Sequence, residues 1–495
     1  MKISFGTKPT PKSPFVFFLQ DGQDILKYPL MRFLANEEVN YIRGAKRSFS
    51  VKEKQSKIFI LPGTERPAIL VGVGTKQAFD YGKVWLGMRI AVTVARRERL
   101  DRITCWGSPV GEPEKTRNVF ENIAANILMA NFEFVKYKTP PPEGFHFLKA
   151  AEFVGEKKDK DITEGLHRGM VIGEEVNRCR DLANTPGGDM TPEVLARHAQ
   201  RAARGLGITA KILNEAKIKS LKMGGVLGVA KGSEAPPRFI ILEYMHGQKT
   251  EKPLILVGKG VTFDAGGLNL KPGEHIYEMH MDMSGGAAVI HALIAVARLK
   301  LRKNIVALVP AVENMPSGES YRPGDVLRTM SGKTIEVLNT DAEGRVILSD
   351  ALEYAKRYKP ALVVDVATLT GAAMVALGLH YTGLFTSDKK LEERFRAIGE
   401  ATADPVWPLP LSAEYEEEVK GTFGDWANTG KPGRGGGAST AAAFLWQFVK
   451  NAKGEQEYPW VHLDIAPRMT AVEGEYLAKG AAGAPVRLLV RLMEN

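Results

Sequence analysis

The sequence predicts an α/β protein with a smaller N-terminal α/β domain and a larger C-terminal α/β domain, whose central sheet is mostly parallel and flanked by helices. Three observations support this prediction. The chain has 495 residues, which at about 150 residues per domain suggests two or three domains. Short apolar runs alternate with helical patterns along most of the chain. Three consecutive prolines at residues 140–142 interrupt this alternation.

The N-terminal part contains several short apolar runs. Those at residues 57–62, 67–74 and 102–107 predict strands, and residues 84–99 have a helical pattern. Gly72 and Gly74 end the second run, as in a dinucleotide-binding loop. Gln77 stands where that pattern needs a third glycine, so we disfavour a nucleotide site at this loop.

A domain boundary is expected near residue 160. The prolines at 140–142 exclude a helix or a central strand there. A charged stretch at 156–165 then leads into a helical pattern at 164–183. We therefore expect an N-terminal domain at residues 1–160, with an oligomerisation or regulatory role, and a catalytic domain at residues 161–495.

The C-terminal part contains continuous runs of Val, Ile and Leu, which suit strands buried on both faces. Helical patterns at 284–299 and 438–449 lie between some of these runs. Ligands of such sheets collect at the carboxyl ends of the strands, so the polar residues that follow each run are the candidates for chemistry. The predicted strands are residues 238–244, 253–260, 304–310, 361–369 and 460–467.

Composition excludes several classes of protein. A hydrophobic fraction of 44% and a charged fraction of 25% are those of a globular chain, not a disordered or fibrous one. The only cysteines, Cys105 and Cys179, argue against a disulfide scaffold and a cysteine-based zinc site. The apolar runs at 15–19 and 366–379 are too short for a signal peptide and a membrane span, respectively. We expect a cytoplasmic protein without membrane association.

The net charge of +10 is compatible with binding to nucleic acid. The basic residues are spread along the chain without a block of five or more. A solvated basic surface is therefore the preferred interpretation, and nucleic-acid binding is the less favoured one.

Charged residues follow the predicted strands of the C-terminal part. Lys259 comes directly after an apolar run, where burial lowers the pKa of a lysine. Asp264 and Lys271 follow within a glycine-containing segment. Asp282 lies between two methionines at the start of a predicted helix.

A third segment, NTDAEGR at residues 339–345, supplies Asp341, Glu343 and Arg345. Their spacing of two places the side chains on one side of an extended chain. A polar turn before a helix is the alternative interpretation of the same letters.

Four carboxylates that converge without cations repel one another and become protonated. Two divalent ions balance Asp264, Asp282, Asp341 and Glu343 if Lys259 is neutral. Lys271 and Arg345 then remain as positive charges that suit a reaction building negative charge on oxygen. Oxygen ligands favour Mg or Mn, with Zn or Co as alternatives.

The chain resembles the leucyl (cytosol) aminopeptidase family of dinuclear metallopeptidases. NTDAEGR is that family's signature, and the stretches VVDVATLTGA and WVHLDIA are also family-like. The resemblance covers roughly residues 165–490. Seven residues match the family's site in order and spacing: Lys259, Asp264, Lys271, Asp282, Asp341, Glu343 and Arg345.

The resemblance implies a role for each residue. Asp264 and Glu343 would bridge two metals. Lys259, through an unprotonated amine, and Asp282 would complete one metal site, and Asp341 the other. Lys271 would polarise the scissile carbonyl, Arg345 would hold bicarbonate as general base, and Asp282 would also bind the peptide's free amine. The positions that would line an apolar first side-chain pocket are Met279, Thr368 and Gly371.

The expected function is therefore a broad-specificity aminopeptidase that prefers leucine and other apolar residues. The resemblance implies two divalent ions per subunit (Mn, Zn or Mg), bicarbonate, peptide substrates and a homohexamer. A DNA-binding regulator on the same fold is the alternative. A two-metal phosphoesterase is disfavoured because the ligand set contains no histidine.

Overall fold

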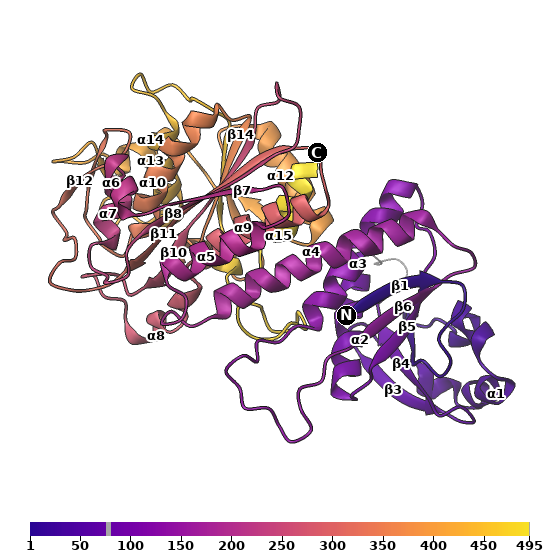
Figure 1. Ribbon diagram of the computed structural model, residues 1–495. Coiled ribbons are helices and arrows are strands. Elements are labelled where there is room, and N and C mark those ends of the chain that lie inside the picture. Colours follow the sequence, from indigo (N-terminus) through magenta and orange to yellow (C-terminus); the bar gives the residue numbers. More distant parts are fainter. Residues whose placement is uncertain (76–80, 495) are drawn as a thin grey trace. The chain divides into compact units, whose positions relative to one another are not determined.

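The computed structural model describes residues 1–75 and 81–494, so Gln77 lies outside the described residues. The chain forms two compact units (Figure 1). One comprises Met1–Asn177 and Val472–Lys479, and the other comprises Arg178–Ala471 and Gly480–Asn495. Their division falls within helix α4 (Lys160–Asn184), whereas the domain limits expected from the sequence place that helix in the second domain. The role expected for residues 1–160 stays a prediction.

The N-terminal unit is built on a six-stranded sheet that is parallel except for β3 at one edge. Helix α2 (Tyr81–Arg97) packs against β4 and against α3 (Pro113–Ala130). All three strands predicted in this unit are present. Residues 131–149, which contain the three prolines, form no helix or strand. The strands in spatial order are β1 (Lys2–Gly6), β6 (Ala150–Val154), β5 (Arg102–Trp106), β2 (Phe15–Leu19), β4 (Arg66–Gly72) and β3 (Ser56–Leu61).

The C-terminal unit is built on a larger sheet whose centre is parallel. All five strands predicted there are present, but β8 runs antiparallel to β11. In spatial order the strands are β16 (Val406–Pro408), β15 (Thr382–Phe385), β18 (Trp460–Asp464), β14 (Leu362–Ala367), β9 (Leu254–Gly258), β11 (Asn304–Asn314), β8 (Arg238–Met245) and β7 (Thr209–Leu213), and β10 (Gly260–Asp264) pairs with β11. A small separate sheet comprises β12 (Val326–Arg328), β13 (Thr334–Glu336) and β17 (Trp426–Ala427).

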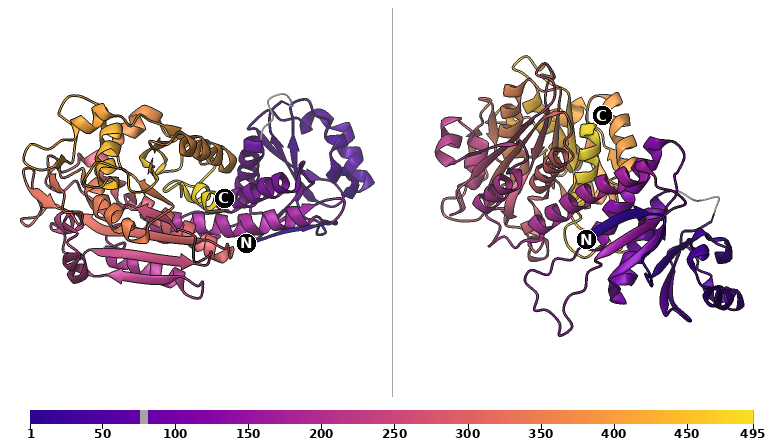
Figure 2. Two further views of the ribbon diagram at one scale, coloured as in Figure 1. Left: turned by 90° about the horizontal axis from the view of Figure 1, so that it is seen from above. Right: turned by 45° about the vertical axis from the view of Figure 1, so that its right-hand side comes forward.

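Helices cover both faces of this sheet (Figures 1 and 2). One face carries α9 (Ser284–Arg298) with α15 (Val486–Glu494), and the other carries α10 (Glu343–Ala355) with α14 (Gly437–Val449). The chain is therefore a mixed α/β protein, as predicted. The remaining helices are α1 (Asn36–Gly44), α5 (Pro192–Ala203), α6 (Glu215–Ser220), α7 (Gly224–Ala230), α8 (Gly273–Ile276), α11 (Gly371–Leu377), α12 (Lys389–Thr402) and α13 (Ala413–Glu418).

One segment of the described chain, Gly273–Arg298, is long and apolar enough to cross a membrane by composition alone. Its most apolar window is 89% buried inside the structure, because α9 packs against β9, β11 and β14. Packing in the core accounts for its apolar composition.

Candidate metal centre

Lys259 lies between β9 and β10 at the carboxyl edge of the sheet and is 3% exposed. Its Nζ is 2.7 Å from Asp282 Oδ2 and 2.7 Å from Glu343 Oε1. It also donates a 2.9 Å hydrogen bond to the carbonyl oxygen of Thr368. Gly344 makes room for this side chain, since a Cβ there would lie 2.7 Å from Lys259 Cε.

Lys271 makes the second pair of ionic contacts. Its Nζ is 2.9 Å from Asp264 Oδ2 and 2.5 Å from Asp341 Oδ1. The loop from β10 reaches this position through Gly266, whose φ of +88° is rare for residues with a side chain. A Cβ on Gly266 would lie 2.4 Å from a backbone oxygen, so this turn requires glycine.

The carboxylates form one cluster. Oxygen atoms of Asp264, Asp341 and Glu343 lie within 4.8 Å of one another, and Lys259 joins Asp282 to Glu343. Asp282 Oδ2, Asp341 Oδ1 and Glu343 Oε1 are buried, and among the described residues each is partnered by a lysine ammonium alone, at 2.7, 2.5 and 2.7 Å, respectively. Buried carboxylate oxygens whose charge is balanced only by neighbouring cations are suited to bind divalent cations. This donor set therefore fits the metals that the sequence predicts.

Burial and mutual repulsion shift the protonation of the acids. Burial, with the charge of Glu343, raises the pKa of Asp264 despite its nearby lysines. Burial is also the main cause that raises the pKa of Asp282, against the opposing effect of Lys259. Burial and Asp264 together raise the pKa of Asp341. These carboxyl groups can all ionise only if concentrated positive charge is placed among them.

The two lysines respond in the opposite sense. Burial lowers their pKa, but the surrounding carboxylates outweigh it and raise the pKa of both Lys259 and Lys271. Among these carboxylates alone, Lys259 therefore carries its proton. The unprotonated amine expected for Lys259 requires divalent cations at the site, because these would offset the negative charge that raises the pKa of Lys259.

A set of neutral side chains holds the acids in place, and the sequence did not single out Asn314. Asn314 Nδ2 donates to Asp264 Oδ1 at 2.8 Å and to the carbonyl oxygen of Thr340 at 3.0 Å. Thr368 Oγ1 donates to Asp282 Oδ1 at 2.6 Å. The strand predicted from the sequence ends at residue 310, whereas β11 continues to Asn314, so the apolar pattern did not indicate this position at the strand end.

Arg345 lies in the first turn of α10 and is 7% exposed. Burial lowers the pKa of its guanidinium to about 10, against the effect of Glu343. Within the described chain, it makes no ion pair closer than 4 Å, and its Nε has no hydrogen-bond partner. A buried guanidinium in this state is suited to bind a small anion.

The extended conformation expected for residues 341–345 is wrong. Glu343 begins α10, and the backbone N–H of Asp341 donates to Asn339 Oδ1 at 2.8 Å in the turn before it. The alternative, a polar turn before a helix, describes this segment. Both carboxylates still reach the cluster. The helix dipole stabilises the negative charge of Glu343, because Glu343 is the first residue of α10.

The three residues expected to line the substrate pocket lie in separate elements. Thr368 follows β14, is buried, and contacts the cluster through Asp282 and Lys259. Met279 is half-buried at the start of a short 3-10 helix, Met279–Met281, and Gly371 is exposed at the start of α11. The carbonyl oxygen of Met279 accepts a 3.4 Å hydrogen bond from the backbone N–H of Asp282, which places Met279 beside the cluster. No contact tests whether Met279 or Gly371 lines a substrate pocket, so that role stays a prediction.

Comparison with known proteins gives the family. A profile described as "Cytosol aminopeptidase family, catalytic domain" matches residues 177–490, which include the whole cluster. The chain belongs to the cytosol aminopeptidase family. This confirms the resemblance identified from NTDAEGR, and it makes the protein a metal-dependent aminopeptidase of the hydrolase class. The family is dinuclear, in agreement with the acidic cluster.

Relatives in the cytosol aminopeptidase family match most of the chain. Proteins named "Probable cytosol aminopeptidase" from Burkholderia mallei (strain SAVP1) and Burkholderia pseudomallei (strain 668) are 42% identical over 428 residues. Each alignment covers 86% of this chain and 83% of the relative.

Solved structures match as well. "Bottromycin maturation enzyme BotP in complex with Mn" is 29% identical with a TM-score of 0.82, over 99% of this chain and 98% of that one. A second structure of the same enzyme, without Mn in its description, has the same identity and TM-score and covers 97% of this chain.

Proposed function

We propose that this protein removes the N-terminal residue from peptides in the cytosol, with a preference for leucine and other apolar residues. One observation carries this proposal. Five side chains from three segments of the chain meet in one largely buried cluster, in which two lysines are the cations closest to four carboxylates. The five are Lys259, Asp264, Asp282, Asp341 and Glu343.

These five side chains would hold two divalent ions. Asp264 and Glu343 would bridge them, with Lys259 and Asp282 completing one site and Asp341 the other. When bound, the ions would lower the pKa of water and polarise a carbonyl oxygen. Mn, Zn and Mg are the candidates, and the Mn in the structure of a relative favours Mn.

Lys271 is proposed to stabilise the negative charge that develops on the substrate's carbonyl oxygen. Its ammonium group lies at the edge of the cluster against Asp264 and Asp341, and those carboxylates raise its pKa. It therefore stays protonated at neutral pH. A fixed positive charge beside a forming oxyanion lowers the barrier to acyl transfer.

Arg345 is proposed to hold bicarbonate, which would supply a general base for the attacking water. Support comes from the burial of its guanidinium and from the absence of an ion pair to it in the described chain. Bicarbonate is a planar anion that a guanidinium can bind with two parallel hydrogen bonds.

Asp282 is proposed to bind the free amine of the peptide, which would restrict cleavage to the amino end. One of its oxygens accepts from Thr368, and the other lies 2.7 Å from the ammonium group of Lys259. Met279, Thr368 and Gly371 are proposed to line the pocket for the first side chain. A homohexamer is proposed from family membership alone, and at the acidic cluster no described residue favours DNA binding, for which the net charge of +10 is the support from the sequence.

The proposal is tested by comparing leucine amide with N-acetyl-leucine amide as substrates of the purified protein in Mn, Zn or Mg. We expect release of ammonia from leucine amide alone, loss of activity with a chelator, and lower kcat/KM for glutamic acid amide. Cleavage of the acetylated substrate would contradict the proposed amine recognition, and activity that survives chelation would contradict the metal requirement.

A further inference from the structure

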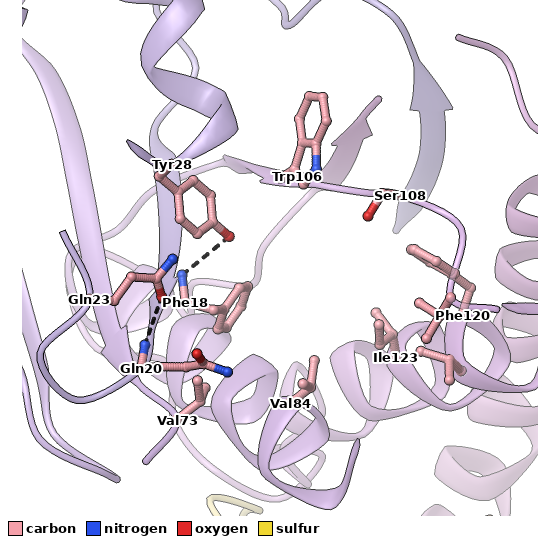
Figure 3. A pocket seen from close by; sticks show the side chains of 12 residues that line it. Phe18, Gln20, Gln23, Tyr28, Val73, Val84, Trp106, Ser108, Phe120 and Ile123 are labelled. Carbon is pink, nitrogen blue, oxygen red and sulfur yellow. Dashed lines mark hydrogen bonds between the residues drawn. The ribbon is translucent and has the colours of Figure 1, made fainter. Parts of the chain in front are cut away.

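The N-terminal unit contains a hollow of about 320 Å³ at the carboxyl ends of β2 and β5 (Figure 3). The two strands are parallel neighbours, with Phe15 paired to Thr104. The volume lies at the lower end of the range of pockets that bind small molecules, about 300–1,000 Å³. None of its lining residues belongs to the acidic cluster.

This position is the topological switch point of the sheet. From β2 the chain continues to β3 and β4 on one side, and from β5 it continues through α3 to β6 on the other. Connections that leave neighbouring strands in opposite directions open a crevice outside their carboxyl ends, where ligands of open α/β sheets bind. The hollow thus lies where the topology predicts a ligand.

The walls are flat and apolar. Phe18, Tyr28, Trp106 and Phe120 are the aromatic residues of the lining, and Val84 is among the aliphatic residues. Figure 3 shows Phe18 and Tyr28 on the side of β2 and Phe120 on α3, whereas the Trp106 ring points away from the space between them. Aromatic walls favour a ligand with a flat ring.

Three polar side chains at the hollow can bond to a ligand. The side-chain amide of Gln20 and the hydroxyl of Ser108 face it, and neither makes a hydrogen bond within the described chain (Figure 3). The hydroxyl of Tyr28 accepts from the backbone N–H of Phe18 at 3.4 Å, which leaves its proton to donate. Together these groups offer both donors and acceptors, as the edge of a heteroaromatic ring requires.

The lining carries no formal charge among the described residues. The guanidinium of Arg32 lies 4.5 Å from the centre of the Trp106 ring, but Arg32 does not line the hollow. Arg32 also pairs with Glu156 at 3.6 Å. The ring that fits this hollow is therefore uncharged.

We propose that this hollow binds a nucleobase, stacked among the aromatic side chains and hydrogen-bonded to Gln20, Ser108 and Tyr28. The base belongs either to a free nucleoside or nucleotide, or to a single-stranded nucleic acid. The site is separate from the residues proposed for peptide hydrolysis, so its test does not depend on that proposal.

Titration calorimetry of the full chain with adenosine, uridine, adenosine monophosphate and a ten-nucleotide single strand tests the proposal, with ribose as the ring-free control. We expect a nucleoside or the strand to bind and ribose not to bind. Gln20→Ala and Ser108→Ala should each weaken binding about twofold to tenfold, the effect of one neutral hydrogen bond. Gln200→Ala is the matched control, because Gln200 is an exposed residue of α5 that does not line the hollow.

Binding by nucleosides identifies a free small molecule as the ligand, and binding by the strand alone identifies a base within a nucleic acid. Both results support recognition of the base, provided that Gln20→Ala weakens them. The proposal is overturned if no probe binds at millimolar concentration. It is also overturned if Gln20→Ala and Ser108→Ala bind as tightly as Gln200→Ala while their melting temperatures match that of the wild type.

Discussion

The amide of Asn314 donates a 2.8 Å hydrogen bond to Asp264 Oδ1. The two oxygens of this carboxylate therefore have different partners. Oδ1 also accepts from the backbone N–H of Gly266 at 2.9 Å. Oδ2 faces Lys271 at 2.9 Å. The carboxylate proposed to bridge two metals is thereby held in one orientation by two neutral donors, the amide of Asn314 at the end of β11 and the backbone N–H of Gly266 after β10.

Asn314→Ala is expected to weaken metal binding about 10- to 100-fold, the usual cost of losing a group that orients a ligand. Competition with a chelator of known affinity measures this effect. Asn304→Ala is the matched control, because Asn304 is a buried asparagine at the opposite end of β11 with three hydrogen bonds of its own. Equal metal affinity in the two variants would contradict the positioning role of Asn314.

Gly344→Ala should disturb the metal centre without replacing any of the proposed ligands. A Cβ at this position would lie within 3 Å of Cε, Cδ and Nζ of Lys259, which must then move. We expect at least a tenfold loss of metal affinity and a fall in kcat. Gly273→Ala is the control, since Gly273 also lies in the first turn of a helix and a Cβ there meets nothing within 4 Å. Metal content equal to that of the control would show that Lys259 is not needed.

Lys271→Ala should keep the bound metal and lose turnover. Removal of a donor that stabilises an oxyanion lowers kcat by about 10²- to 10³-fold. Elemental analysis and steady-state kinetics on the same preparation separate the two effects. Lys211→Ala is the control for removal of a lysine paired to a carboxylate, here Glu243 at 2.8 Å. A variant that loses its metals would assign Lys271 to the metal site instead.

His462 is expected to make the stability of the fold depend on pH. Burial lowers its pKa, but Asp365, whose Oδ1 is 2.5 Å from His462 Nδ1, outweighs this and raises it. A group whose pKa is raised by folding stabilises the fold fully below its unfolded value, near 6.5, and loses that effect as pH rises through the folded value. The difference in melting temperature between the wild type and His462→Gln should therefore be largest at pH 6 and shrink towards pH 9.

The exposed His275 supplies the control for this series, because its side chain is 69% exposed. His275→Gln should follow the wild type at every pH. A difference between the wild type and His462→Gln that stays constant from pH 6 to 9 would show that Asp365 does not hold a charged imidazole.

Much of this architecture could be predicted from the sequence, for definable reasons. Strands buried on both faces appear as continuous apolar runs, and the seven charged residues from Lys259 to Arg345 occur in a specific order that fits one family. The direction of β8 could not be predicted, because a strand buried on both faces has the same composition whether it runs parallel or antiparallel.

Two features of the site also escaped sequence reasoning. Residues 341–345 read as an extended chain by their spacing of two, but a turn followed by a helix start brings Asp341 and Glu343 to the same cluster. Asn314 lies 50 residues from Asp264 in the sequence, and only the pairing of β10 with β11 brings them together. Contacts that depend on pairing between strands leave no local signal.

The central claim is that five side chains form a cage for two divalent ions. Anomalous diffraction from crystals grown with Mn tests it most directly. The account predicts two strong peaks, both bounded by Lys259, Asp264, Asp282, Asp341 and Glu343, with Asp264 and Glu343 touching both. No peak in this cluster, or Mn bound only elsewhere on the protein, would contradict it.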